Sequence, residues 1–287
     1  MQRVLFIGCG DIALRTARLL GQRYQLYGLI RHQDKAKTLR AVGICPIVGD
    51  LDQPATLSRI SGLAHMVFHF APPPASGKQD TRTRHLLNAL TKRGILPQRL
   101  IYISTSGVYG NCAGAEINES RTVNPQTDRA CRRVDAERQL RAWGRQTGSQ
   151  VVILRVPGIY AANRLPIERI RAGLPALLSE EDGYTNHIHA QDLARIAIAA
   201  SLRGQSQRVY NVVDEDVMKM GDYFDRVADV AGLPRPPRIN RAEASQRLTP
   251  AMLSFMDESR RLCAHRLHAE LKIRLHHPTL VTGLQAE

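Results

Sequence analysis

Short apolar runs alternate with amphipathic stretches through the first half of the 287-residue chain. The runs are rich in Val, Ile, Leu and Phe and are apolar almost throughout, as strands buried on both faces of a parallel sheet should be. Strands are expected at residues 4–7, 26–30, 45–48, 66–70, 100–103 and 151–154, with helices between them at 11–22, 33–41, 54–60, 79–92 and 128–145. This order predicts an α/β fold with a Rossmann-type, doubly wound parallel sheet.

Beyond Pro157 the alternation loosens into shorter pieces separated by Pro and Gly. One more strand is expected at 209–213, and helices are expected at 191–202, 220–231 and 258–271. We therefore expect a larger domain of residues 1–157, to which residues 186–213 return, and a small α/β lobe of residues 158–185 and 214–287.

The turn after the first strand carries candidate chemistry. Strand 4–7 runs into Gly8-Cys9-Gly10-Asp11-Ile12-Ala13 and then into a helix, which is the context that a G-x-G-x-x-G/A dinucleotide fingerprint requires. Gly8 permits a tight turn, and Gly10 lets a pyrophosphate approach the backbone beside the N–H groups of the helix N-terminus. A purely structural glycine turn is the alternative. The cofactor contacts predicted here are Gly8, Gly10, Asp11 and Ile12.

The end of the second strand indicates which dinucleotide binds. An Asp or Glu there would accept hydrogen bonds from the ribose of NAD, but this chain has Arg31 and no acid before Asp34. An arginine can bind a 2′-phosphate through several N–H donors, so NADP(H) is expected in preference to NAD(H), unless Arg31 is simply an exposed cation. Asp50 and Leu51, after the third strand, are expected at the adenine, although Asp50 could instead cap a helix.

The chain is strongly basic, with a formal charge of +14. Clustered Lys and Arg would favour nucleic acid, but the basic residues are spread along the chain, and acidic residues interrupt the densest stretch, 129–145. Aromatic residues make up only 5% of the chain, too few for a base-stacking platform. The positive charge is therefore expected to bind an anionic small molecule rather than nucleic acid.

The five cysteines are scattered and form no CxxC pair, so neither a disulfide framework nor a metal site is indicated. The first apolar strand begins at Val4 without a basic leader, and no apolar run reaches the roughly 18 residues of a membrane span. A cytoplasmic protein without a membrane partner is expected, and a homodimer is left open.

Further motifs follow one another along the chain. Gly49-Asp50-Leu51 follows the third strand, Ala71-Pro72-Pro73-Pro74 the fourth, and Ser104-Thr105-Ser106-Gly107-Val108-Tyr109-Gly110 the fifth. Later come Leu154-Arg155-Val156-Pro157-Gly158-Ile159-Tyr160 and Asn186-His187-Ile188-His189-Ala190-Gln191-Asp192-Leu193-Ala194. Together with the phosphate-binding turn, these motifs make nearly the whole chain resemble the extended short-chain dehydrogenase/reductase family, which includes nucleotide-sugar epimerases and dehydratases.

The resemblance implies places for further site residues. Thr105 would stand at the position of the catalytic Ser or Thr, beside the nicotinamide. Residues 253–261 resemble a region where substrate contacts are often found, although helix packing explains the apolar side chains there equally well. The cofactor pocket would also include Ala71, Pro72, Ser104, Pro157, Gly158 and Ile159.

One departure from the family pattern changes the expected mechanism. The family's catalytic Tyr-x-x-x-Lys precedes an Ala-Glu pair, here Ala136-Glu137, and counting back reaches Arg129 and Arg133. None of the eight tyrosines is followed by Lys four residues later. An arginine stays protonated at any working pH and cannot relay a proton as the Tyr and Lys do. In this respect the chain resembles an atypical branch of the family, whose members keep the fold and usually the cofactor pocket.

Two functions therefore stay open. The first is an oxidoreductase or epimerase/dehydratase-like enzyme on a small anionic or nucleotide-linked substrate. In this enzyme Arg129 and Arg133, on one helix face, would bind the substrate or the cofactor, and Arg133 is placed among the expected cofactor contacts. The second is a catalytically weak or inactive NADP(H)-binding redox sensor or scaffold. For the enzyme, the candidate catalytic residues are Thr105, Tyr109, Tyr160, Tyr184 and His187. His187 and His189 would share one side of a strand, more as a pocket wall than as metal ligands.

Overall fold

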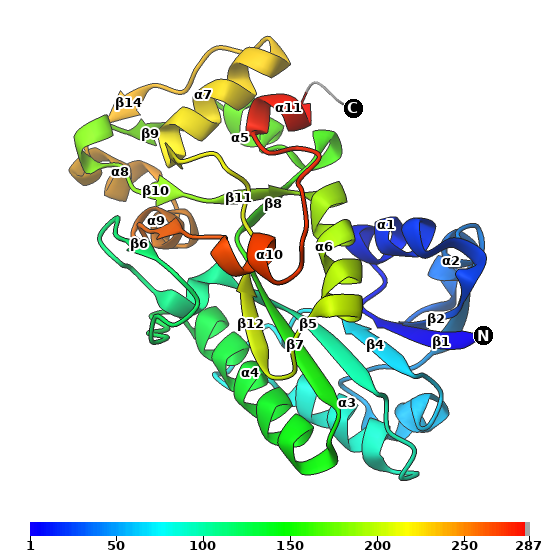
Figure 1. The fold of residues 1–287 in the computed structure, drawn as a ribbon. Coiled ribbons are helices and arrows are strands. Elements are labelled where there is room, and N and C mark those ends of the chain that lie inside the picture. Colours follow the sequence, from blue (N-terminus) through cyan, green and yellow to red (C-terminus); the bar gives the residue numbers. More distant parts are fainter. Residues whose placement is uncertain (285–287) are drawn as a thin grey trace.

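The structure, a computed structural model that describes residues 1–284, is built around a seven-stranded sheet (Figure 1). All neighbouring strands of this sheet pair in parallel, which confirms the predicted Rossmann-type architecture. The strands, in spatial order, are β12 (Arg208–Asn211), β7 (Gln150–Val156), β5 (Arg99–Thr105), β4 (Met66–His69), β1 (Gln2–Ile7), β2 (Tyr24–Ile30) and β3 (Ile44–Val48).

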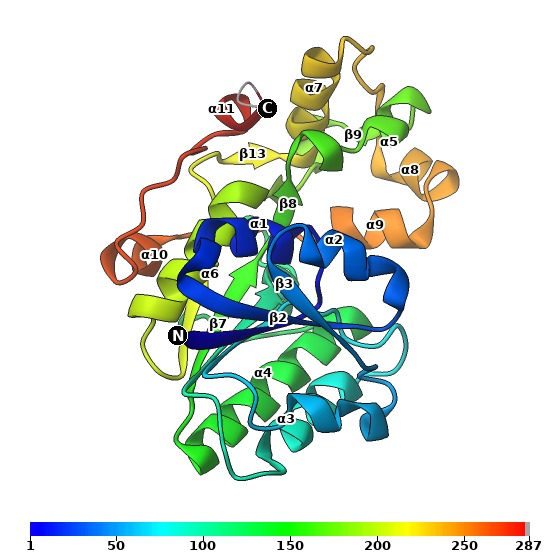
Figure 2. The ribbon, with the colours of Figure 1, turned by 90° about the vertical axis from the view of Figure 1, so that its right-hand side faces the viewer.

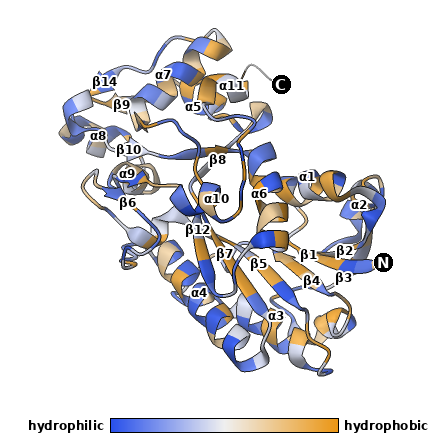
Figure 3. Ribbon diagram, viewed as in Figure 1, coloured by the Kyte–Doolittle hydropathy of each residue, from blue (hydrophilic) through white to orange (hydrophobic). Residues whose placement is uncertain are grey.

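Helices cover both faces of the sheet because alternate strand residues point to opposite sides. On β1, Val4 and Phe6 join the core beneath α1 (Asp11–Leu20), α2 (Ala36–Arg40) and α6 (Ala190–Arg203). Leu5 and Ile7 join the opposite core, against η3 (Pro54–Ile60), α3 (Thr81–Thr91) and α4 (Asp128–Thr147). Figures 1 and 2 show these two helical layers on either side of the sheet, and Figure 3 shows its strands as largely hydrophobic.

A second group of elements gathers above the carboxyl ends of the strands (Figures 1 and 2). A separate apolar cluster, which includes Tyr160, Ile170, Phe224 and Met256, holds most of them together. They are β8 (Gly158–Tyr160), α5 (Ile167–Arg171), β9 (Ala176–Leu177), β10 (Tyr184–Thr185), β11 (His187–His189), β13 (Met218–Lys219), α7 (Met220–Ala231), β14 (Arg238–Ile239), α8 (Arg241–Arg247), α9 (Pro250–Met256) and α11 (Leu280–Leu284). The last three residues of the expected lobe segment 214–287 lie outside the described residues.

The helix predicted at 258–271 is wrong. The structure has a short strand, β15 (Arg261–Leu262), followed by a short helix, α10 (His265–Ala269). β15 pairs in parallel with β6 (Glu116–Ile117), and the Cys263 N–H donates to the Ile117 carbonyl at 2.8 Å. These hydrogen bonds to a segment distant in sequence replace the bonds that a helix would have made locally.

None of the helices within residues 1–284 combines the length and apolar character needed to cross a membrane.

A buried ion pair lies where α4 meets the carboxyl end of the sheet. Glu137 of α4 and Arg155 of β7 are 4% and 5% exposed, and the Arg155 Nε and Nη2 atoms donate to the two Glu137 carboxylate oxygens at 3.1 and 2.7 Å. Ser104 of β5 donates to the same carboxylate at 2.6 Å. Burial opposes the charge on Arg155, but the hydrogen bonds and charge of Glu137 outweigh it and raise the arginine's pKa.

We predict that Arg155→Met lowers the free energy of unfolding by about 3–5 kcal/mol, because it leaves the Glu137 carboxylate buried without its cation. The double variant Glu137→Leu/Arg155→Met removes both charges and should recover most of that loss. Urea unfolding followed by circular dichroism measures both variants. Equal losses in the single and double variants would contradict this account of the ion pair.

Candidate active site

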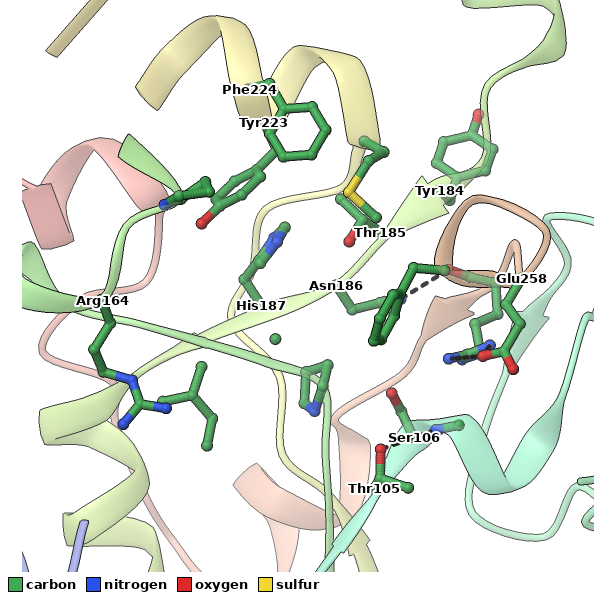
Figure 4. Close-up of a pocket in the computed structure, with 18 of the residues that line it drawn as sticks. Thr105, Ser106, Arg164, Tyr184, Thr185, Asn186, His187, Tyr223, Phe224 and Glu258 are labelled. Atoms are coloured by element: carbon green, nitrogen blue, oxygen red, sulfur yellow. Dashed lines mark hydrogen bonds and ion pairs between the residues drawn. The ribbon is translucent and has the colours of Figure 1, made fainter. Parts of the chain in front are cut away.

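Two cavities open at the carboxyl ends of the parallel strands. The first, of about 440 Å³, is bordered by the turn after β1 and by the ends of β2, β3 and β4. The second, of about 360 Å³, lies between the end of β5 and the elements above the sheet (Figure 4). Ile159 and Arg164 line both cavities, so a ligand longer than either cavity could extend from one into the other.

Gly8 makes the turn that starts the first cavity. Its φ of +92° lies in the region that side chains rarely adopt, and a Cβ atom there would come within 2.4 Å of the Ala71 backbone nitrogen. The close approach lets the Phe70 and Ala71 N–H groups both donate to the Ile7 carbonyl. Only glycine fits this position without moving the loop after β4.

Gly10 and the start of α1 form a cradle for an anion. A Cβ atom on Gly10 would meet no atom of the described part of the chain within 4 Å, because the position faces open space. The first N–H groups of an α-helix lack partners within the helix, and Gly10 has no side chain to cap those of α1. A backbone approachable at Gly10, beside a positive helix end, fits a dinucleotide pyrophosphate.

A cationic group follows β2 at the far end of the first cavity. Arg31, His32 and Lys35 are exposed side chains that line it. Arg31 makes no hydrogen bond or ion pair with any residue that the structure describes. Its donors are therefore available to a ligand.

Helix α4 presents one arginine to each cavity. Arg133 lines the first cavity, where it donates to the Ile103 carbonyl at 2.8 Å and to the Tyr102 hydroxyl at 3.0 Å. Arg129, one helical turn earlier, lines the second cavity, with its guanidinium carbon 3.8 Å from the centre of the Phe255 ring. These two positions, where the Tyr and Lys were sought in the sequence, thus carry fixed positive charge.

The second cavity also contains a paired carboxylate. Glu258 and Arg260 have side chains that are 8% and 10% exposed, and the arginine donates twice to one Glu258 oxygen at 2.9 Å. The pair neutralises itself, whereas Arg129 makes no ion pair within residues 1–284. Arg129 is therefore the cation of this cavity that is free to bind an anion.

His187 and Tyr223 form the upper wall of the second cavity in Figure 4. Their rings stack with centroids 4.0 Å apart and an interplanar angle of 19°. Burial lowers the pKa of His187 to about 3, so the ring is neutral at physiological pH. Burial, with a contribution from Asp214, raises the pKa of Tyr223 to about 12, so its phenol keeps its proton. Neither imidazole nitrogen has a hydrogen-bond partner among the described residues.

Most of the predicted site residues line the two cavities. Thr105 lies at the end of β5, and its Oγ1 accepts a hydrogen bond from the Gly107 N–H at 3.2 Å. The Tyr184 hydroxyl points away from Thr105 and Ser106 (Figure 4). The first cavity brings together Gly8, Gly10, Asp11, Ile12, Arg31, Asp50, Leu51, Ala71, Pro72, Arg133 and Ile159, and the second Thr105, Pro157, Gly158, Ile159, Tyr184 and His187.

Three candidates lie in the protein interior instead of lining these cavities. The Ser104 hydroxyl is 2% exposed and donates to Glu137. Tyr109 is 1% exposed, and its hydroxyl donates to Asn211 Oδ1 at 2.8 Å. The Tyr160 hydroxyl donates to the Thr279 carbonyl at 3.1 Å. The structure therefore does not bring these side chains to either cavity.

Sequence reasoning missed several residues of the second cavity. Tyr223 and Arg164 stand in no recognisable motif, so nothing in the sequence marked them. Phe255, Glu258 and Arg260 fall within 253–261, the segment that the resemblance indicated, although their individual roles could not be read from it.

The sequence model of the NAD dependent epimerase/dehydratase family matches residues 14–213. The dTDP-D-glucose 4,6-dehydratase of Mus musculus is 24% identical over 139 residues, which is 45% of this chain. The chain spans only 38% of the length of that curated relative.

Solved structures match over nearly the whole chain. A functionally unknown conserved protein from Silicibacter pomeroyi has a TM-score of 0.84 at 27% identity, covering 100% of this chain and 98% of that one. The dTDP-glucose 4,6-dehydratase of Bacillus anthracis, solved in complex with NAD, has a TM-score of 0.80 at 15% identity, covering 99% and 94%. The UDP-glucose 4-epimerase of Thermotoga maritima, solved with UDP-glucose, has a TM-score of 0.80 at 17% identity, covering 99% and 96%. At such low identities, the last two matches show a shared fold alone.

The two glycines of the turn should respond differently to alanine. Gly8→Ala should lower the free energy of unfolding by at least about 2 kcal/mol, because it combines backbone strain with a clash. Gly10→Ala should change it by no more than about 1 kcal/mol, because the added methyl group meets open space. Urea unfolding of both variants tests this difference, and a stable Gly8→Ala protein would contradict the geometry of the turn.

His187 should show no protonation between pH 8 and 5, because its pKa of about 3 lies below that range. Nuclear magnetic resonance of the imidazole carbons measures this, with the His187→Gln spectrum identifying the signal and the urea-unfolded protein giving an ordinary histidine titration near pH 6.5. Between about pH 3 and 6.5 the folded state binds fewer protons here than the unfolded state, so this residue makes stability rise with pH. A midpoint between pH 5.5 and 7.5 in the folded protein would refute a buried, neutral ring.

Proposed function

Because the chain belongs to the NAD dependent epimerase/dehydratase family, we propose that it binds NADP(H) and acts as an oxidoreductase or epimerase/dehydratase-like enzyme on a small anionic or nucleotide-linked substrate. The observation that carries this proposal is the pair of adjoining cavities at the carboxyl ends of the strands. The first has the glycine turn and the α1 N-terminus that suit a dinucleotide, and the second has room for a substrate beside it.

The preference for NADP(H) rests on the charge at the end of β2. Arg31, His32 and Lys35 stand on the cavity wall where a ribose 2′-phosphate would lie. Arg31 can direct several N–H donors at one phosphate, and it forms no ion pair within residues 1–284. The Arg82 hydrogen bond and, less strongly, the charge of Arg31 nevertheless lower the pKa of the nearby Asp52 carboxyl. The three side chains would together favour the phosphorylated dinucleotide.

The nicotinamide end of the ligand would lie where the cavities meet. A bound nicotinamide supplies the oxidation and reduction of a substrate carbon. Pro157, Gly158 and Ile159 would flank it, and Arg133, fixed to the Ile103 carbonyl, would present its remaining donors on the opposite side. These residues hold and orient the ligand without exchanging protons.

The second cavity suits a substrate that carries negative charge. Arg129 is half-buried and makes no ion pair with the residues that the structure describes. Burial, which outweighs the nearby charge of Glu258, lowers its pKa, so an anion there would relieve the cost of desolvating the guanidinium. Phe255 holds the guanidinium against its ring face. A carboxylate or phosphate beside an apolar or ring-shaped group, as in a nucleotide sugar, matches these neighbours.

Hydrogen-bond donors must replace the missing Tyr and Lys in any catalytic role. His187 is neutral, and its low pKa makes it a poor base, so it is better suited to donating a hydrogen bond to a substrate oxygen. The Thr105 hydroxyl hydrogen is also free for a substrate, because its oxygen serves the Gly107 N–H as acceptor. Tyr184 lines the same cavity, with its hydroxyl directed away from Thr105.

A second candidate function, a weak or inactive NADP(H)-binding redox sensor or scaffold, is favoured by one specific observation. Arginines occupy both α4 positions where a proton relay was sought, and no arginine titrates at working pH. Such a protein would bind the dinucleotide and turn over slowly or not at all.

Titration calorimetry with NADPH, NADP, NADH and NAD tests the cofactor proposal. Wild type should bind the two phosphorylated forms more tightly, and Arg31→Ala should weaken NADPH binding about 10- to 100-fold by removing a charge-assisted contact of about 1.5–3 kcal/mol. NADH binding should change little in that variant. Arg40→Ala, at an exposed arginine of α2 outside the cavity lining, is the matched control.

The outcomes separate the parts of the proposal. Equal binding of NADPH and NADH by wild type would refute the NADP(H) preference, and no binding of any of the four would refute the cofactor altogether. Incubation of the NADP-loaded protein with UDP-glucose, UDP-glucuronate or dTDP-glucose, followed by absorbance at 340 nm and chromatography of the sugar, then distinguishes the two functions. Tight cofactor binding without any product would favour the sensor.

A further inference from the structure

We propose that Arg164 is a clamp for the pyrophosphate of the bound dinucleotide: its guanidinium would leave Asp11 and donate its hydrogen bonds to the phosphate oxygens instead. The inference rests on the proposed function, because it requires a dinucleotide that extends from the first cavity into the second. It assigns a ligand contact to Arg164, which lies above the sheet and is not part of any recognisable sequence motif.

Arg164 reaches across the junction of the two cavities. It ends η5 (Ala162–Arg164), which is separated by one residue from β8, the strand that contains Ile159, and its side chain is 35% exposed. Its Nη1 atom lies 3.4 Å from Asp11 Oδ2, in the first turn of α1. Figure 4 shows Arg164 at the side of the second cavity opposite Glu258. The guanidinium therefore lies beside the turn that would receive the pyrophosphate.

Two arginines approach one carboxylate at this position. Asp11 is shared by two arginines, because its Oδ1 accepts from Arg15 Nε at 3.0 Å while Oδ2 faces Arg164. One carboxylate thus serves two guanidinium groups. A phosphate at the turn would be repelled by Asp11 alone, but Arg15 offsets the carboxylate charge and leaves Arg164 to act on the ligand.

The contact between Arg164 and Asp11 is weak enough to exchange. Strong charge-assisted hydrogen bonds have lengths of about 2.7–2.9 Å, and the 3.4 Å contact is longer. Partly exposed ion pairs contribute about 0–1 kcal/mol. Two adjoining phosphate groups offer the guanidinium several acceptors in a geometry that its planar donors match, so the exchange favours the ligand.

The position of Arg164 identifies the pyrophosphate as its target. In a dinucleotide that extends from the Arg31 end of the first cavity to the Pro157–Ile159 segment, the pyrophosphate lies between the two nucleosides, at the glycine turn and the α1 N-terminus. The Asp11 carboxylate marks that place, since Asp11 is the first residue of α1. A phosphate belonging to a substrate in the second cavity shares the same chemistry and is the other source of anion.

The clamp would also fix the chain above the cofactor. Two residues after Arg164, Pro166 starts the turn into α5, whose Ile170 is buried in the apolar cluster with Phe224 and Val227. Holding Arg164 on the ligand would therefore hold this side of the second cavity in place.

Calorimetry with two probes tests the clamp. NADPH contains the pyrophosphate, whereas adenosine 2′-monophosphate carries the adenosine and the 2′-phosphate but neither phosphate of the pyrophosphate. Arg164→Gln should weaken NADPH binding about 10- to 100-fold, as expected for a lost charge-assisted contact, and should leave adenosine 2′-monophosphate binding unchanged. Arg164→Lys keeps the charge without the planar donors and should fall between. Arg171→Gln, at a 60% exposed arginine of the same segment, should change neither.

Each other result overturns the proposal. If wild type binds NADPH and Arg164→Gln binds it equally well, the clamp is wrong while the proposed function stands. If both probes weaken equally, Arg164 shapes the pocket instead of contacting the pyrophosphate. If Arg164→Gln weakens only the binding of UDP to the NADPH-saturated protein, the arginine serves a substrate phosphate. If wild type does not bind NADPH, the proposed function fails together with the clamp. Unchanged thermal unfolding midpoints show that the variants are folded.

Discussion

The buried ion pair between Glu137 and Arg155 is the constraint on which the rest of the site depends. Two opposite charges removed from water are tolerable only because they meet at 2.7 Å and share further hydrogen bonds. Glu137 belongs to α4 and Arg155 to β7, and the Ser104 hydroxyl on β5 joins them. The pair thus fixes α4 against the carboxyl end of the sheet, and with it the Arg129 and Arg133 side chains that face the two cavities.

The same pair explains why an apparently suitable tyrosine is unavailable for chemistry. The Arg155 guanidinium lies 4.7 Å from the centre of the Tyr109 ring, whose hydroxyl donates to Asn211 on β12. Tyr109 therefore completes a buried network that joins α4 to three neighbouring strands. In the proposed function, chemistry would therefore fall to residues of the second cavity, whose hydroxyl, imidazole and guanidinium groups can donate hydrogen bonds without readily taking up protons.

The sequence predicted the sheet well because strands buried on both faces are continuous apolar runs. Such runs can be recognised without knowing which strands pair with one another. The turn at Gly8 and Gly10 was equally readable, since its glycines follow from local geometry. The helix predicted at 258–271 failed because Arg261 and Leu262 pair with β6, more than a hundred residues earlier. Tyr223 and Arg164 reach their cavities only through packing above the sheet, and no local pattern encodes that placement.

The structure also shows where the basic residues that give the formal charge of +14 lie, although they are not clustered in the sequence. Some arginines form ion pairs inside the protein: Arg155 pairs with Glu137, and Arg260 pairs with Glu258. Others are left without an ion pair and face the cavities, as Arg31 and Arg129 do among the described residues. The net charge does not distinguish the paired arginines from the unpaired ones. The positions of the unpaired arginines, however, show where a bound anion would lower the electrostatic energy. Those places lie along one path, from the end of β2, across the α1 N-terminus, to α4.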